Sequence, residues 1–196
     1  MKMTRPLLAA VLLGTSAAAQ PGSAPDLAAG PWDPPTRIAA QREAMKALAF
    51  LDGEWRGIAR AEEAPGEMAH TERVGTLLDG TIRLVEGRAY DSAGNSQFNA
   101  FAIISYDPVK RTYSMQTYAM GYAGDYPLTV RPDGFSWSHP AEPGTTMRYS
   151  ATVKDGEWHE VGERVAGAAA PVKTVELRVR RLGPSAWPQG GEVKRR

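Results

Sequence analysis

From residue 55 onward, polar and apolar side chains alternate with a period of two, which is typical of β-strands with one buried face. Turn sequences such as Asp79-Gly80, Pro132-Asp133-Gly134 and Asp155-Gly156 interrupt this pattern at short intervals. They separate ten predicted strands, at residues 55–63, 67–78, 81–91, 97–106, 111–120, 126–131, 134–139, 145–154, 157–166 and 172–182. Strands in hairpin order without a helical period between them predict an all-β, antiparallel up-and-down barrel of about 8–10 strands, because closure hides the sheet edges.

One helix is predicted before the strands. Asp33 is a suitable N-cap, and two prolines follow it in the first turn. The apolar residues of the segment fall on one side of a helix that ends near Gly53. We therefore assign residues 35–52 to an N-terminal helix and residues 53–182 to the barrel domain. Residues 183–196, rich in glycine and proline, are expected to form a disordered tail.

The first residues are typical of an export signal. Lys2 and Arg5 precede an apolar run at 7–13, and the small residues 17–19 form a cleavage site. The apolar run is shorter than the roughly 20 residues needed to cross a bilayer, and no longer run follows it. We predict a signal peptide at 1–19, a flexible lead-in at 20–34, no membrane span, and a periplasmic or secreted mature protein.

Large side chains at alternate positions of several strands indicate what fills or lines the barrel. Aromatic rings, a methionine and a histidine lie on one face, at residues 135, 137 and 139 of one strand and at 147 and 149 of the next. Such rings fill a core or line a pocket for a small ligand. From these strands and the one at 111–120 we select as candidate ligand-binding residues Tyr113, Met115, Trp137, His139 and Tyr149.

Two charged residues complete the candidate site. Glu86 and Arg88 share the parity of Ile82 and Leu84, so this alternation predicts that they point inward. Buried charges require partners, which neighbouring strands or a ligand carboxylate would supply. Val85 and Ala89 also make the opposite face of this strand apolar, and that alternation would place the charged pair outside.

Composition and charge exclude several classes of function. The chain has no cysteine, which excludes disulfides and thiolate metal sites. The formal net charge of +1 becomes −1 without Lys2 and Arg5, which gives no argument for a nucleic-acid partner. The three histidines lack metal-ligand spacing, and no nucleophile or phosphate-loop motif is present. We therefore predict no metal, no cofactor and no catalytic residue.

The strand at 98–104 is apolar on both faces. A second apolar face requires a cover, so we expect this strand to pack beneath the N-terminal helix or against another subunit in a homodimer.

The stretch Leu51-Asp52-Gly53-Glu54-Trp55-Arg56-Gly57 resembles the start of the first strand in the calycin superfamily, the lipocalins and their bacterial relatives. Together with Ser105-Tyr106-Asp107 and Tyr113, it is similar to a bacterial family of lipocalin-like domains of unknown function. The resemblance covers about residues 45–182. It implies that Trp55 closes one barrel end beneath an arginine of the last strand, either Arg180 or Arg181. We favour Arg181 for this role, because it lies two residues after the inward Val179 and so on the same face of the strand.

Three hypotheses follow from these patterns. The leading one is an exported lipocalin-like barrel that binds a small, mostly apolar ligand, and an enzyme is the less favoured alternative. The enzyme, an isomerase, cyclase or hydrolase of a hydrophobic substrate, would use Glu86, His139 or a tyrosine as acid or base. The third hypothesis is a structural or interaction protein of the cell envelope, with the strand at 98–104 as its partner surface.

Overall fold

The computed structural model describes residues 33–64 and 66–189. The predicted signal peptide, most of the lead-in and the last seven residues of the predicted tail lie outside these ranges. Among the described residues, no helix has the length and apolar character to cross a membrane.

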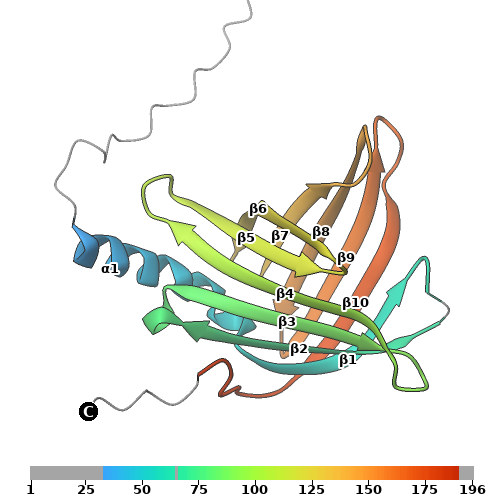
Figure 1. Cartoon of the computed structure of the whole chain (residues 1–196), viewed down its shortest axis with the longest axis horizontal. Helices are drawn as coiled ribbons and strands as arrows, with labels where there is room; N and C mark the ends of the chain where they lie inside the picture. The colour runs from blue at the N-terminus through green and yellow to red at the C-terminus, as the bar shows by residue number, and fades with distance from the viewer. Residues whose placement is uncertain (1–32, 65, 190–196) are drawn as a thin grey trace, which may run out of the picture.

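Ten antiparallel strands form a closed barrel, as the alternation predicts (Figure 1). They are β1 (Gly53–Ala61), β2 (Met68–Leu77), β3 (Ile82–Tyr90), β4 (Ser96–Asp107), β5 (Thr112–Ala119), β6 (Tyr122–Arg131), β7 (Gly134–Pro140), β8 (Thr145–Lys154), β9 (Glu157–Ala166) and β10 (Val172–Gly183). Each strand pairs with the next, and β1 pairs with β10 to close the ring. The turn between β8 and β9 has positive φ at both Asp155 and Gly156, as a two-residue hairpin of this sequence requires.

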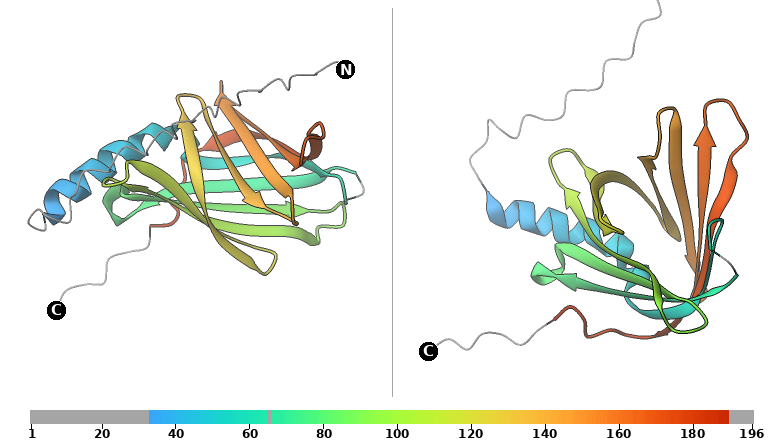
Figure 2. Two further views of the ribbon diagram at one scale, coloured as in Figure 1. Left: turned by 90° about the horizontal axis from the view of Figure 1, so that it is seen from above. Right: turned by 45° about the vertical axis from the view of Figure 1, so that its right-hand side comes forward.

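The predicted helix is two elements, α1 (Pro34–Met45) and the 3-10 helix η1 (Lys46–Leu51). Asp33 caps α1 by accepting a hydrogen bond from the Thr36 backbone N–H at 3.5 Å. The helical segment therefore ends where the sequence predicts, but its last six residues form a 3-10 helix. Because a 3-10 helix has three residues per turn, Leu48 and Leu51 lie on one side of η1, three and six residues after Met45 at the end of α1, and all three are buried. Figure 2 shows α1 extending away from one end of the barrel.

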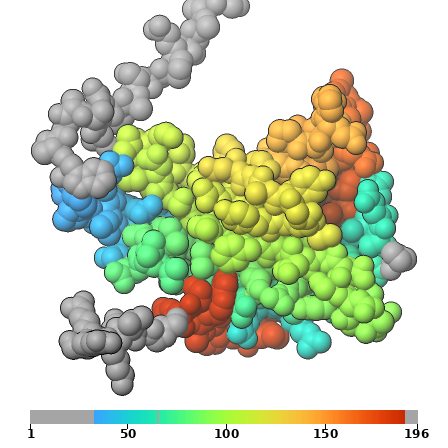
Figure 3. Space-filling view, viewed as in Figure 1, coloured from blue at the N-terminus to red at the C-terminus, as the bar shows by residue number. Residues whose placement is uncertain are grey.

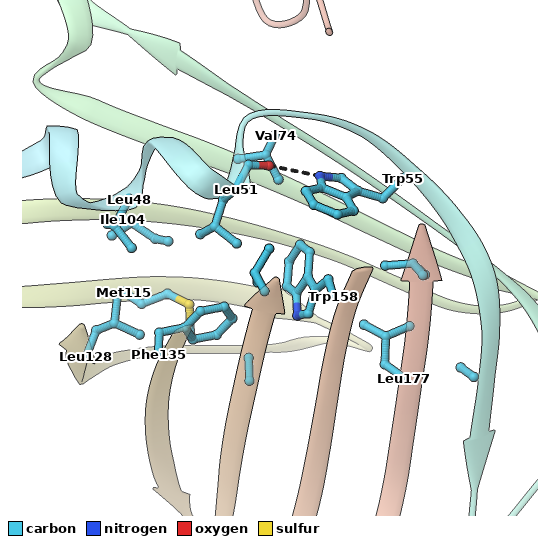
Figure 4. Close-up of a cluster of buried hydrophobic side chains, with 14 of the residues drawn as sticks. Leu48, Leu51, Trp55, Val74, Ile104, Met115, Leu128, Phe135, Trp158 and Leu177 are labelled. Carbon is cyan, nitrogen blue, oxygen red and sulfur yellow. Dashed lines mark hydrogen bonds between the residues drawn. The ribbon is translucent and has the colours of Figure 1, made fainter. Parts of the chain in front are cut away.

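Trp55 and η1 close that end of the barrel. The indole is 1 % exposed, and its Nε1 donates a hydrogen bond to the Leu51 carbonyl at 2.9 Å (Figure 4). The Arg181 guanidinium lies 4.4 Å from the ring centroid and donates to the carbonyl oxygens of Phe50 and Asp52. Arg180 instead bonds Glu157 on the outer surface. The arrangement predicted for Trp55 and Arg181 is confirmed.

An ion pair between a buried arginine and a partly exposed aspartate also attaches η1 to the wall. Arg83 of β3 is 2 % exposed and binds both carboxylate oxygens of Asp52, at 2.6 and 2.9 Å. Its remaining nitrogen, Nη1, donates to the Met45 carbonyl at 2.8 Å. These bonds satisfy a charge that would otherwise be costly to bury, and they fix the end of the helical segment on the barrel.

The C-terminal segment after β10 packs along the outside of β2, β3 and β4 (Figures 1 and 3). Trp187 lies edge-on to Phe101 at 6.3 Å, and the Arg73 guanidinium lies 4.6 Å from its ring centroid. A Cβ at Gly75 would meet the Trp187 carbonyl oxygen at 1.9 Å, so this close approach depends on glycine. The prediction of disorder from residue 183 is wrong as far as residue 189. This segment gives the doubly apolar strand at 98–104 a cover on its outer face, and α1 also contacts β4.

Candidate functional site

The half of the barrel away from η1 encloses a cavity of about 830 Å³. Its walls are mostly apolar, and its floor is formed by core residues that also contact the closed end, among them Ile104, Met115, Phe135, Trp158 and Leu177 (Figure 4). The loops that join β1 to β2, β5 to β6 and β7 to β8 contribute to its rim. The cavity therefore has a closed floor and a mouth at the opposite end.

Stacked aromatic rings form one side of the cavity. The rings of Trp137 and Tyr149 are nearly parallel, with centroids 4.3 Å apart and an interplanar angle of 9°. His139 stacks on both of them, and Tyr126 lies 5.7 Å from Trp137. Tyr126 and Trp137 come from β6 and β7, whose ladder extends over only four residue pairs. The rings thus meet across the seam where backbone pairing between these two strands stops.

His70 and Glu72 of β2 place polar atoms in the opposite wall. Strand alternation puts them on the same face as the buried Met68 and Val74, and the two side chains are 5 % and 8 % exposed. His70 Nε2 lies 2.7 Å from Glu72 Oε1. The second nitrogen of the imidazole, Nδ1, and the second oxygen of the carboxylate, Oε2, are buried without a hydrogen-bond partner. Both residues line the cavity, although these two atoms are themselves covered by the wall.

Gly87 of β3 makes room for the Glu72 carboxylate. A Cβ at position 87 would lie 2.6 Å from Glu72 Oε1. Gly87 lines the cavity and pairs in register with Glu72. The absence of a side chain there lets the carboxylate lie flat against the neighbouring strand.

Glu160 of β9 is a second carboxylate inside the barrel. Its Oε2 accepts a hydrogen bond from Trp158 Nε1 at 3.2 Å, and its side chain lines the cavity. Burial, and then the nearby charge of Glu72, raise the pKa of the Glu160 carboxyl from 4.5 to about 7, although hydrogen bonds from Trp158 and Trp137 act in the opposite direction. Burial, followed by the charge of Glu160, raises the pKa of Tyr149 above its usual range. The cavity therefore couples three titratable side chains from β2, β8 and β9.

The structure brings together four of the seven residues selected from sequence. Met115, Trp137, His139 and Tyr149 line the cavity. Tyr113 does not, because its hydroxyl donates to the Ala44 carbonyl at 2.7 Å, near the closed end. His139 Nδ1 lies 2.9 Å from the Pro140 carbonyl oxygen, at the exposed rim.

Glu86 and Arg88 lie on the outer surface, so the prediction that they face inward is wrong. Val85, Gly87 and Ala89 line the cavity, which places the charged pair on the other face of β3. Arg88 Nη2 lies 2.5 Å from Glu86 Oε1. Burial raises the pKa of the Glu86 carboxyl, but the hydrogen bonds from Arg73 and Arg88 outweigh it and lower the pKa below its usual range. The acid or base role considered for Glu86 within a cavity does not fit this position.

The misleading signal was Leu84, which shares the face of Glu86. It is 7 % exposed, yet it does not belong to the core cluster inside the barrel. It pairs in register with Gly75, over which the Trp187 backbone passes. Leu84 is therefore buried on the outside of the barrel by the C-terminal segment, and its apolar character wrongly indicated that its face of β3 points inward.

The polar residues of the cavity, His70, Glu72 and Glu160, were not selected from sequence. Strand parity contained a usable signal, because Glu72 lies two residues before Val74, and Glu160 two residues after Trp158, on the same buried faces. Within the described ranges, no three histidine or carboxylate side chains are grouped so as to hold a metal ion.

Comparison with known proteins supports the barrel fold. No protein-family model matches the chain, and no curated protein matches it. Among solved structures, the crystal structure of Rv2717c from M. tuberculosis is similar, with a TM-score of 0.53 and 13 % sequence identity. The similarity covers 70 % of this chain and 96 % of that chain. At this identity the likeness concerns the fold alone.

Proposed function

We propose that this chain is an exported, lipocalin-like barrel that binds a small, mostly apolar molecule in its interior. The observation that carries the proposal is the cavity of about 830 Å³ with its closed floor. Cavities of about 300–1,000 Å³ with apolar walls and a few polar groups are typical of small-molecule sites. The signal-like sequence at residues 1–19 is the basis for export.

The energetics favour an apolar ligand. Transfer of a ligand from water to an apolar wall contributes about 0.8 kcal/mol for each buried CH₂ group. A ligand that enters without displacing the floor or the stacked rings of Trp137 and Tyr149 would keep more of this free energy as affinity.

Native mass spectrometry of protein purified from its own host tests the proposal by detecting molecules that stay bound. A second test uses the neutral fluorophore N-phenyl-1-naphthylamine and the variant Ala100→Trp, which adds an indole to a residue that lines the cavity. The matched control is Asn99→Trp, on the exposed outer face of the same strand. We expect the cavity variant to weaken dye binding at least about tenfold and the control to leave it unchanged. Absence of saturable binding to the unmodified protein would refute the proposal.

A further inference from the structure

We infer that the cavity recognises a protonated amine carried by an otherwise apolar ligand, with Glu72 and Glu160 as the groups that receive it. This inference rests on the proposed function and assigns the head group of its ligand. Three observations support it: a buried carboxylate oxygen without a partner, the balance of charge along the walls, and the position of the aromatic rings.

The first observation is that the Glu72 carboxylate has an oxygen without a hydrogen-bond partner. Its Oε2 is buried without a partner, while its Oε1 already bonds His70. A buried carboxylate oxygen that bonds nothing costs about 1–3 kcal/mol or more, so such atoms in proteins usually have a partner when the protein is at work. Glu72 lines the cavity, so a turn of its carboxylate brings this oxygen to a hydrogen-bond donor on a ligand.

The second observation is the charge of the lining. Glu72 of β2 and Glu160 of β9 both line the cavity, and the charge of Glu72 raises the pKa of the Glu160 carboxyl. Among the described residues that line the cavity, the only lysine or arginine is Arg60, which lies in β1 near the mouth and bonds Glu67. A ligand carboxylate or phosphate placed beside Glu72 and Glu160 would meet groups of like charge. A cation would relieve the repulsion between the two carboxylates.

The third observation is the aromatic wall beside Glu160. Trp137 lowers the pKa of the Glu160 carboxyl, against the effect of burial, and stacks on Tyr149. The faces of such rings attract cations, and the attraction strengthens where water is excluded. An ammonium group also supplies three donors, which suits two carboxylates and a ring better than the single donor of an alcohol.

The test compares three probes with the same tail and different head groups, decylamine, decanol and decanoate, by titration calorimetry at pH 8. Primary alkylamines remain protonated there, as lysine side chains do with a pKa of about 10.4. We expect decylamine to bind at least about tenfold more tightly than decanol, since hydrogen bonds to charged groups contribute about 1.5–3 kcal/mol. Decanoate should bind more weakly than decanol.

Variants then locate the selectivity. Glu72→Gln and Glu160→Gln keep the size of the side chain and remove its charge, and each should reduce the preference for decylamine over decanol severalfold. Glu163→Gln is the matched control, because Glu163 is on β9 but bonds Arg148 on the outer surface. The ratio of the two affinities is measured within one variant, so a loss of folded protein does not alter it.

The outcomes separate the two proposals. If none of the three probes binds, the proposed function itself fails. If decanol or decanoate binds as tightly as decylamine, the cavity binds apolar molecules and the inference about the amine is overturned. Equal selectivity in Glu72→Gln, Glu160→Gln and the unmodified protein would also overturn it.

Discussion

Glu160→Gln should make the protein more stable at alkaline pH. The carboxyl has a pKa raised from 4.5 to about 7, first by burial and then by Glu72, so the folded protein holds this proton more tightly than the unfolded chain does. The stability that the protonated group confers is complete below about pH 4.5 and is lost as the pH rises through about 7. Above that range both states are ionised, and the loss is constant.

The magnitude follows from the change in proton affinity. A tenfold change corresponds to about 1.4 kcal/mol, so the rise from 4.5 to about 7 amounts to ~3 kcal/mol. Glutamine cannot ionise, and the variant therefore avoids this loss. The difference in unfolding free energy between Glu160→Gln and the unmodified protein should grow by ~3 kcal/mol in favour of the variant between pH 4.5 and pH 8.5.

Urea denaturation followed by tryptophan fluorescence at several pH values measures this difference. Other titrating groups act similarly in both proteins, so most of their contributions cancel. Glu163→Gln is again the control, because an exposed pair such as Glu163 and Arg148 contributes at most about 1 kcal/mol. A difference between Glu160→Gln and the unmodified protein that does not change with pH would refute the buried, carboxylate-rich site described above.

Three further predictions concern stability and use the same denaturation measurement. Trp55→Ala should lower the unfolding free energy by about 3–5 kcal/mol, because it opens a cavity beneath Arg181; a loss below 1 kcal/mol would contradict its role in closing the barrel. Asp52→Asn should cost about 1–3 kcal/mol, because it removes the charge that faces the buried Arg83, and Asp52→Asn combined with Arg83→Met should recover part of this loss. Trp187→Ala should cost about 1–3 kcal/mol and expose the outer face of β4 to limited proteolysis; unchanged proteolysis would show that the segment is not held by its indole.

The fold could be predicted from the sequence where polar and apolar residues alternate clearly along a strand. In β7 and β8, aromatic or methionine residues alternate with serine, threonine and arginine, and the predicted parity of Trp137 and Tyr149 is the one observed. The stacking of Arg181 on Trp55 followed from parity together with a family resemblance. Both signals are local to one strand or one pair of strands.

The candidate site could be predicted from the sequence only in part, because several of its buried residues are polar. In β2, histidine and glutamate occupy the inward face, and in β3 the inward positions 87 and 89 are glycine and alanine while charged residues lie outside. A rule that places polar residues outside fails wherever a cavity needs polar atoms. The packing of Trp187 on Phe101 could not be foreseen either, because it joins the chain end to a strand more than eighty residues earlier.

Closure of the ring through β1 and β10 also has a kinetic consequence. Arg181 bonds the Asp52 carbonyl, a partner 129 positions earlier in the chain. Contacts of such long sequence separation slow folding, because much of the chain loses entropy before they form. Until β10 arrives, β1 and β9 both present unpaired backbone groups, which are templates for association with other chains. Folding time and the tendency to aggregate should therefore depend on the docking of the last strand more than on any of the hairpins.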